Sequence, residues 1–393
     1  MKKKVGLIIP SMKNGGAERV LSTMSLNFDK DIEQYIYVWD GEKADYEYKG
    51  NLIDLGIENK TNLFANVVVL IKRVLKIRKY KKEHKIETSI SFLEGPNIVN
   101  ILSRYKEKVI ITVHNFQSKE RKGLYGKIFK FLIKRYYNNA DLIVAVSKLI
   151  KEDLIKNFNI DESKIEVIYN PYDIELIRSK MCEELEDEHK EIFNKPVIIN
   201  IGRLTHQKGQ WKLIKSFKEI KKQIPDVKLV IMGKGELEED LKNLTKKLGI
   251  NSDVHFLGFQ KNPFKFIHKS KVFALSSFYE GFPMCLAESL ACETSIVSTD
   301  CNSGPNEILN IEDNIYEKID SIKYGDFGIL VPNFKDESIK INNLLDEDEL
   351  NMASAIIMML NDAELRKKYE SIGKKRVEDF SVKKIMKQWQ KNI

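Results

Sequence analysis

The sequence predicts an α/β fold with two doubly wound parallel-sheet domains, and three observations support this: chain length, alternation of strands with helices, and one break in that alternation. The chain has 393 residues, too many for one ordinary core and suited to two domains of roughly 150 to 200 residues each. Hydrophobic residues make up 42 % of it and charged residues 31 %, as in ordinary globular proteins. Two such domains predict a deep cleft between them.

The first half of the chain alternates short apolar runs with amphipathic helical patterns. The first run, residues 5–9, leads through a turn at Gly15 and Gly16 into a pattern whose apolar residues recur every three or four positions, as in a helix with one buried face. Further strand candidates are residues 35–39, 86–92, 109–113, 142–146 and 165–168. Strands separated by helices in this way predict a parallel sheet.

A charged segment, residues 183–190, separates this half from a second series of strands, so we place the hinge between Pro171 and Pro196. The second series comprises residues 197–201, 228–232, 254–257, 272–275 and 295–298, and the tail 349–393 has a helical pattern throughout. The predicted domains are residues 1–175 and 176–375, followed by a C-terminal helix, 376–393, that returns to the first domain.

Several classes of protein are excluded by composition. No stretch reaches the 18 or so uncharged apolar residues of a membrane-spanning helix, and Lys2 to Lys4 run into a short strand instead of a signal-peptide core. We therefore expect a cytoplasmic protein that does not cross the bilayer. The cysteines lack the close pairs of zinc sites or disulfide frameworks, which predicts four buried thiols: Cys182, Cys285, Cys292 and Cys301.

Two carboxylates form the sharpest motif. Glu280 and Glu288 lie on either side of a strand-to-helix turn, and Pro283 suits the first turn of the helix. Glu280 is therefore predicted in a loop at the carboxyl end of a strand, where α/β sheets bind ligands. Carboxylates there can accept hydrogen bonds from sugar and ribose hydroxyls. The alternative is a pair of solvated acids near a helix N-terminus.

Two cations form a second motif. Arg203 and Lys208 follow the strand at 197–201 and precede a helix that begins near Gly209. A guanidinium can bind two phosphate oxygens and an ammonium adds a point charge. Such fixed cations can stabilise a departing diphosphate without a metal ion. The alternative is a solvated basic turn.

Glycines and one histidine complete the candidate site. Gly15 and Gly16 lie where a strand meets a helix, so a phosphate could approach the backbone and the helix N-terminus; Gly233 marks a comparable loop in the second domain, and a plain turn is the alternative. His114 directly follows the strand at 109–113, which places it at the carboxyl edge of the first sheet, facing the cleft. A hydrogen-bonded structural role is its alternative.

In this order the motifs resemble the family 4 glycosyltransferases over nearly the whole chain. The shared motifs are residues 15–19, 140–147, 170–171, 202–203, 208–209, 233–236, 303–308 and 328–332, Glu280 with Glu288, and a closing helix that carries Trp389. The resemblance implies the GT-B fold, which pairs two Rossmann-like domains, and a retaining transferase that needs neither a metal ion nor a cofactor.

The resemblance also implies roles for single residues. Arg203 and Lys208 would bind the donor diphosphate, Glu288 the ribose, and Glu280 the hydroxyls of the transferred sugar, while His114 would lie against that sugar and assist the developing cation. The predicted catalytic residues are thus Glu280, His114, Arg203 and Lys208. The predicted donor-binding residues are Gly15, Gly16, Arg203, Lys208, Gly233, Glu280, Gly281, Phe282, Pro283, Met284 and Glu288.

Positive charge is concentrated in the first half. The net charge is +8, but residues 60–140 hold 19 Lys and Arg against 5 Glu, which gives this segment +14 and the remainder −6. Two helical patterns, 67–85 and 119–135, mix these cations with apolar residues, as surfaces for anionic lipid do. The predicted membrane-binding residues are Lys72, Arg73, Lys76 and Lys79. The alternatives are a solvated helix face over a buried stripe, or nucleic acid, for which no binding module is recognised.

These observations favour an enzyme that moves a hexose or N-acetylhexosamine from a nucleotide diphosphate sugar, UDP preferred over GDP, to a lipid-linked saccharide or glycolipid in surface polysaccharide synthesis. A soluble acceptor, as in sucrose or glycogen synthesis, is the alternative. A non-catalytic basic binding protein is disfavoured by the intact charged motifs. A metal-dependent GT-A enzyme is disfavoured because the Asp-x-Asp candidates, at Asp29 and Asp346, do not follow a mid-domain strand.

Overall fold

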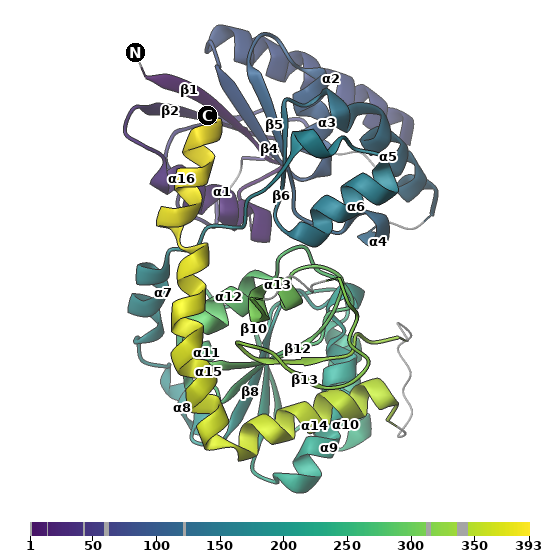
Figure 1. Cartoon of the computed structure of the whole chain (residues 1–393), viewed down its shortest axis with the longest axis vertical. Coiled ribbons are helices and arrows are strands. Elements are labelled where there is room, and N and C mark those ends of the chain that lie inside the picture. Colours follow the sequence, from purple (N-terminus) through teal and green to yellow (C-terminus); the bar gives the residue numbers. More distant parts are fainter. Residues whose placement is uncertain are drawn as a thin grey trace. The chain divides into compact units, whose positions relative to one another are not determined.

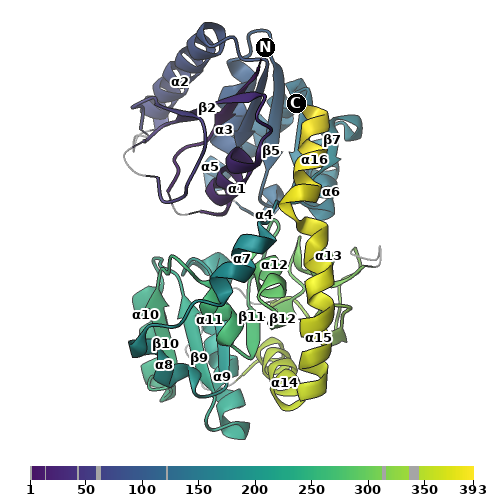
Figure 2. The same cartoon turned by 90° about the vertical axis from the view of Figure 1, so that its left-hand side faces the viewer.

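The computed structural model describes residues 2–13, 15–41, 44–58, 63–120, 123–311, 316–335 and 345–393. The chain forms two compact units (Figure 1). Unit 1 comprises Met1–Tyr172 and Ser381–Ile393, and unit 2 comprises Asp173–Phe380. Each unit contains one twisted sheet with helices packed on it (Figures 1 and 2).

The sheet of unit 1 has seven parallel strands in the order β3-β2-β1-β4-β5-β6-β7. The strands are β1 (Lys3–Ile8), β2 (Ile32–Val38), β3 (Asn51–Asp54), β4 (Thr88–Phe92), β5 (Lys108–Val113), β6 (Leu142–Ala145) and β7 (Ile165–Val167). The strand order reverses between β1 and β4, which is the topological switch point where such sheets bind ligands. The central strands β4 and β5 are buried on both faces, apart from Lys108, because helices cover the sheet.

Seven α-helices of unit 1 lie in its described part. They are α1 (Gly16–Asn27), α2 (Leu63–Glu83), α3 (Glu94–Leu102), α4 (Gln117–Glu120), α5 (Gly123–Tyr136), α6 (Lys148–Phe158) and α16 (Val382–Asn392). Local sequence sets their ends: Ser147 caps α6 by accepting a hydrogen bond from the Ile150 amide, and left-handed Asn159 ends that helix. The C-terminal helix α16 buries Ile385, Met386 and Trp389 and packs on α1.

The sheet of unit 2 repeats this topology in the order β10-β9-β8-β11-β12-β14-β13. Its strands are β8 (Val197–Ile201), β9 (Lys228–Met232), β10 (Val254–Gly258), β11 (Val272–Leu275), β12 (Ser295–Thr299), β13 (Lys323–Tyr324) and β14 (Ile329–Val331), with β13 antiparallel to β14. Its α-helices are α7 (Ile174–Met181), α8 (Asp187–Phe193), α9 (Gln210–Gln223), α10 (Glu238–Leu248), α11 (Phe264–Lys269), α12 (Met284–Ala291), α13 (Pro305–Leu309), α14 (Glu347–Asn361) and α15 (Ala363–Arg376).

A buried ion cluster joins α9 to α14 in unit 2. Lys215 Nζ lies 2.7 Å from Glu349 Oε2, and Lys212 Nζ lies 3.3 Å from Glu349 Oε1. All three side chains are almost fully buried. Removing one partner of such a cluster leaves an unpaired buried charge, at a cost of about 3–5 kcal/mol. The cluster therefore fixes how these helices pack.

The structure confirms the predicted fold class of two parallel-sheet, Rossmann-like domains and corrects some details. The units divide after Tyr172 and after Phe380, and the charged segment 183–190 lies inside unit 2, where it forms the loop after α7 and the start of α8. The tail is three α-helices separated at Asp362 and near Ser381. Strands β3, β13 and β14 were not predicted. The prediction of a buried thiol is wrong for Cys182, which is exposed.

No helix in the described part of the chain is both long and apolar enough to cross a bilayer.

Candidate active site

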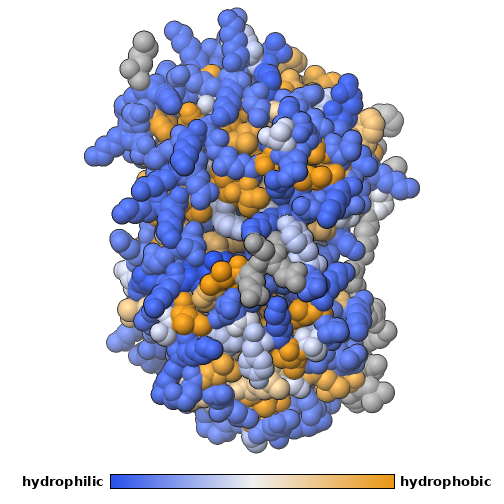
Figure 3. Space-filling model, in the orientation of Figure 1, coloured by the Kyte–Doolittle hydropathy of each residue, from blue (hydrophilic) through white to orange (hydrophobic). Residues whose placement is uncertain are grey.

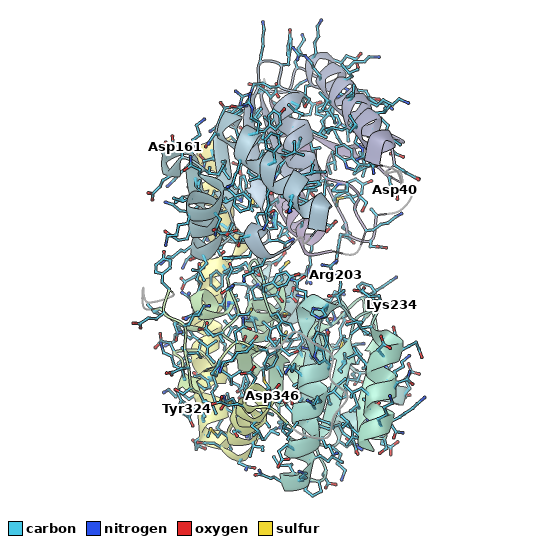
Figure 4. All side chains as sticks on the ribbon, turned by 90° about the vertical axis from the view of Figure 1, so that its right-hand side faces the viewer. Asp40, Asp161, Arg203, Lys234, Tyr324 and Asp346 are labelled. Atoms are coloured by element: carbon cyan, nitrogen blue, oxygen red, sulfur yellow. The ribbon has the colours of Figure 1, made fainter. Side chains whose placement is uncertain are left out.

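The loops after β8, β9 and β11 meet at the carboxyl edge of the sheet in unit 2, since β8 pairs with both β9 and β11. Arg203 lies exposed in the loop after β8. The neighbouring residue Leu204 donates its amide to the Lys234 carbonyl at 3.0 Å, so the loops after β8 and β9 are joined. Figure 4 accordingly shows Arg203 and Lys234 at the same end of unit 2.

The glycine of the loop after β9 has a structural role. Gly233 has φ +136, and a Cβ placed there would lie 2.0 Å from the Gly202 carbonyl oxygen. Only glycine fits this conformation and this close approach. The sequence predicted Gly233 as a donor-binding residue. The structure explains why this position is a glycine, because the missing side chain lets the loops after β8 and β9 come into contact.

Lys208 and Glu280 form an ion pair, although 72 residues separate them. Lys208 Nζ lies 2.5 Å from Glu280 Oε1, and Ser277 Oγ donates to the same oxygen at 2.6 Å. Burial opposes the charge of Lys208, but the carboxylate of Glu280 outweighs burial and raises the pKa of the lysine. Lys208 is therefore positively charged at neutral pH, and Glu280 holds its ammonium group in place.

Gly209 fixes the position of Lys208. Its backbone is left-handed, with φ +60, and a Cβ there would lie 2.3 Å from the Ser276 carbonyl oxygen. The hydroxyl of Ser276 also donates to the Lys208 carbonyl at 2.9 Å. The loop after β8 is thus fastened to the loop after β11 at this point. Sequence reasoning missed both Ser276 and Ser277, although their place directly after a buried strand was a usable signal.

The segment from Gly281 to Met284 is held from a second loop. Ser303 Oγ donates to the Gly281 carbonyl at 2.6 Å, and Gly304, at φ +93, passes so close to Pro283 that a Cβ would lie 2.3 Å from its Cδ. The ring of Phe282 packs edge-on against Phe380. Pro283 is the N-cap of α12, which begins at Met284.

Glu288 lies on α12 and is only 3 % exposed. A buried carboxylate is uncommon unless it is paired or has a functional role. The structure brings together at one edge of unit 2 the predicted residues Arg203, Lys208, Gly233, Glu280 and the 281–284 segment, with Glu288 on the helix that follows.

In unit 1, His114 directly follows β5 as predicted. Its ring stacks on Phe92, with ring centroids 5.8 Å apart, and its Nε2 lies 2.8 Å from Thr112 Oγ1. Burial lowers the pKa of His114 to about 4, because an apolar surrounding disfavours the imidazolium. The imidazole is therefore neutral at physiological pH.

A carboxylate lies beside the predicted glycine turn of unit 1. Gly15 is extended, with φ −175, and a Cβ there would lie 2.0 Å from Glu18 Oε2. The Glu18 carboxylate therefore lies over Gly15 at the N-terminus of α1, beside Gly16. A phosphate at this turn would need that side chain to rotate away, because two anions repel each other.

On α2 the four predicted membrane-binding cations divide into two classes. Lys72 and Lys79 are exposed. Arg73 is 8 % exposed; its Nε donates to the Ile57 carbonyl at 3.0 Å, and its guanidinium stacks 4.7 Å from the ring of Trp39. The prediction is wrong for Arg73, whose charge serves the fold. Lys76 is half-buried and donates to the Leu55 carbonyl at 2.7 Å.

The same helix exposes apolar side chains that amphipathic patterning had assigned to a stripe. The exposed fractions are 52 % for Val67, 51 % for Val68, 53 % for Ile71 and 62 % for Leu75. Spacings of four and seven residues place them on one face of the helix. Figure 3 shows hydrophobic patches among hydrophilic surface where α2 lies in unit 1. In the basic segment 60–140, the cations Lys60, Arg121 and Lys122 lie outside the described residues.

In the described part of the chain, no group of three or more His, Cys, Asp or Glu side chains is placed so that it could hold a metal ion. Asp346, one of the Asp-x-Asp candidates, caps α14 and pairs with Lys212.

Two seven-stranded Rossmann-like sheets, one carrying a cluster of cations and acids at its carboxyl edge, are the architecture of the GT-B glycosyltransferases. Two family models match the chain: "Glycosyltransferase Family 4" over residues 14–176 and "Glycosyl transferases group 1" over residues 183–323. The chain belongs to the family 4 glycosyltransferases.

Similar proteins agree with this assignment. An uncharacterized glycosyltransferase of Methanocaldococcus jannaschii is 39 % identical, over 81 % of this chain and 82 % of the relative. The N-acetylgalactosamine-N,N'-diacetylbacillosaminyl-diphospho-undecaprenol 4-alpha-N-acetylgalactosaminyltransferase of Campylobacter jejuni is 31 % identical, over 98 % and 97 %. The fold is similar to that of Anabaena HepE, solved with UDP and glucose, at a TM-score of 0.76 and 17 % identity over 99 % of both chains.

Proposed function

We propose that this enzyme transfers a hexose or N-acetylhexosamine from a UDP-sugar, with retention of configuration, to a lipid-linked saccharide or glycolipid at the inner face of the cell membrane, in surface polysaccharide synthesis. The observation that carries the proposal is the Lys208–Glu280 ion pair beside Arg203 at the sheet edge of unit 2. It combines a cation for a leaving phosphate with an acceptor for sugar hydroxyls.

In this proposal the donor bond breaks between the sugar C1 and the β-phosphate oxygen. Arg203 and Lys208 stabilise the charge that builds on the diphosphate, and since the chain itself supplies these two cations, no metal ion or other cofactor is required. The acceptor hydroxyl oxygen bonds to C1 on the same face, and its proton passes to a departing phosphate oxygen. Retention follows from attack on the face that the diphosphate leaves.

The other predicted residues would contact the sugar and the ribose of the donor. Glu280 accepts hydrogen bonds from hydroxyls of the transferred sugar through carboxylate lone pairs that Lys208 and Ser277 do not occupy. Glu288 accepts hydrogen bonds from the ribose. Neutral His114 would contact the transferred sugar, since an uncharged imidazole does not repel an oxocarbenium-like centre.

The acceptor side of the proposal rests on α2. Its exposed face combines Ile71 and Leu75 with the cations Lys72 and Lys79. A helix of this kind can insert apolar side chains shallowly while its cations meet anionic headgroups. The names of relatives that act on diphospho-undecaprenol saccharides support the same class of acceptor.

The test is a panel of UDP- and GDP-sugars, each assayed for nucleotide release and for transfer to a lipid-linked acceptor, with and without EDTA. We expect one UDP-sugar to be used, the anomeric configuration to be kept, and activity to persist in EDTA. Loss of activity in EDTA that Mn²⁺ or Mg²⁺ restores would overturn the metal-free step. Transfer to a water-soluble sugar alone would favour the soluble-acceptor alternative.

A further inference from the structure

Thr112, two residues before His114 on β5, makes two short polar contacts through one oxygen. Its Oγ1 lies 2.8 Å from the carbonyl oxygen of Ser91 on the neighbouring strand β4, and 2.8 Å from His114 Nε2. Thr112 is buried. Both contacts therefore operate away from water, where a misoriented hydrogen bond is costly.

Counting protons assigns the direction of each contact. A threonine hydroxyl has one proton, and a carbonyl oxygen has none to give. The Thr112 proton must therefore point to Ser91, which leaves the hydroxyl oxygen as an acceptor toward His114. From this geometry we infer that Thr112 is a positioning residue that holds His114 as the tautomer protonated on Nε2, with the lone pair on Nδ1.

The surrounding network keeps both partners of Thr112 in place. Ser91 Oγ donates to Asn97 Oδ1 at 2.8 Å, and Asn97 Nδ2 donates to the Thr112 carbonyl at 2.8 Å and to Tyr137 Oη at 3.2 Å. All of these residues are buried. The Ser91 carbonyl thus has a fixed position from which to take the hydroxyl proton, and stacking on Phe92 restricts the imidazole ring.

The consequence for catalysis rests on the role of His114 in the proposed function. Because burial keeps the ring neutral at pH 7, only one nitrogen carries a proton. Because Nε2 donates that proton to Thr112, the lone pair of Nδ1 can accept a hydrogen bond from a sugar hydroxyl. It can also stabilise positive charge at the carbon that is transferred. The other tautomer would present an N–H dipole of the wrong sign.

The experiment reads the tautomer directly. Protein labelled with ¹⁵N-histidine has six histidines, and His114→Gln assigns the signal of His114 in long-range ¹H–¹⁵N correlation spectra. We expect the wild-type signal, at neutral pH, to show Nε2 protonated and Nδ1 bare. A wild-type signal with Nδ1 protonated would overturn the inference without any variant.

Two variants test the part played by the hydroxyl. Thr112→Val keeps the volume but removes the acceptor, and should lose the Nε2–H tautomer and lower kcat by about tenfold, the usual effect of one lost buried hydrogen bond, with the donor KM little changed. Thr112→Ser restores the hydroxyl and should behave like wild type. An unchanged tautomer in Thr112→Val would overturn the inference.

Failure of the proposed function gives a different result. If His114→Gln transfers sugar as well as wild type while the wild-type spectrum shows the Nε2–H tautomer, the hydroxyl still positions the ring, and only the role of His114 in transfer is lost.

Discussion

The two units place opposite chemistry at the same position of one topology. In both, the strand order reverses beside the first strand, between β1 and β4 in unit 1 and between β8 and β11 in unit 2. The edge of unit 2 carries Arg203 and the Lys208–Glu280 pair, whereas β5 in unit 1 ends in the uncharged pair of Thr112 and His114. The scaffold therefore sets where a site lies, and the loops set its charge.

The two units also differ in where their lysines lie. Unit 1 holds most of the positive charge of the chain, and its helix α2 exposes four large apolar side chains beside exposed lysines. Unit 2 buries its lysines Lys212 and Lys215 in an ion cluster with Glu349. The exposed lysines of α2 are thus available to a large partner, whereas Lys212 and Lys215 are not.

The largest test of this comparison is Arg203→Ala. Because Arg203 is exposed and would act on charge that develops in the transition state, turnover should fall roughly a hundredfold or more with little change in Tm. Lys222→Ala, an exposed lysine on α9, is the control and should keep full activity. Turnover near wild type in Arg203→Ala would remove the charged edge of unit 2 from the mechanism.

How far the sequence predicts this fold depends on the burial and the length of each strand, and β14, although buried, has only three residues. Strands β5 and β8 are runs of apolar residues covered on both faces, so their composition alone identifies them. Strand β3 is only partly buried and β13 is exposed, and each has few residues. Their pairing depends on neighbouring strands, and local sequence does not contain that information.

The candidate site shows the same division. The sequence predicted Lys208 and Glu280 with separate roles, because their pairing follows from β8 lying beside β11. Helical periodicity predicted that Arg73 shares a helix with Lys72, but not that Trp39 and Ile57 cover it. For Thr112 a signal did exist: a spacing of two residues places it and His114 on one side of an extended chain.

The next largest effect concerns the outer surface of unit 1. Changing both Ile71 and Leu75 to Glu should abolish flotation with anionic vesicles and lower transfer to a lipid-linked acceptor by about tenfold. Two carboxylates would then face the anionic headgroups, which repel them, in place of two apolar side chains that can insert. Nucleotide release from the donor in solution should persist. Lys72→Glu with Lys79→Glu should weaken flotation most at low salt, where screening is small.

Exposed apolar residues elsewhere provide the matched control for this test. Leu350 and Met358 lie on α14 of unit 2 with exposed fractions of 45 % and 40 %. Replacing both with Glu should leave flotation intact. Equal loss in both double variants, or flotation of the Ile71/Leu75 variant like wild type, would mean that α2 is not the membrane face.

The smallest predicted effect is on donor affinity, and it separates binding from catalysis within unit 2. Glu288→Gln keeps the shape of a buried side chain but removes its charge, and should weaken UDP binding by about tenfold in calorimetry, because hydrogen bonds to a charged acceptor are the stronger ones. A ribose contact is the same in the ground and transition states, so the donor KM should rise while kcat holds. Glu293→Gln, just after α12, controls for charge, since that carboxylate pairs with Lys374 at 2.7 Å. If Glu288→Gln lowers Tm but leaves UDP affinity unchanged, Glu288 is a structural acid, and donor binding at this edge rests on Arg203 and the Lys208–Glu280 pair.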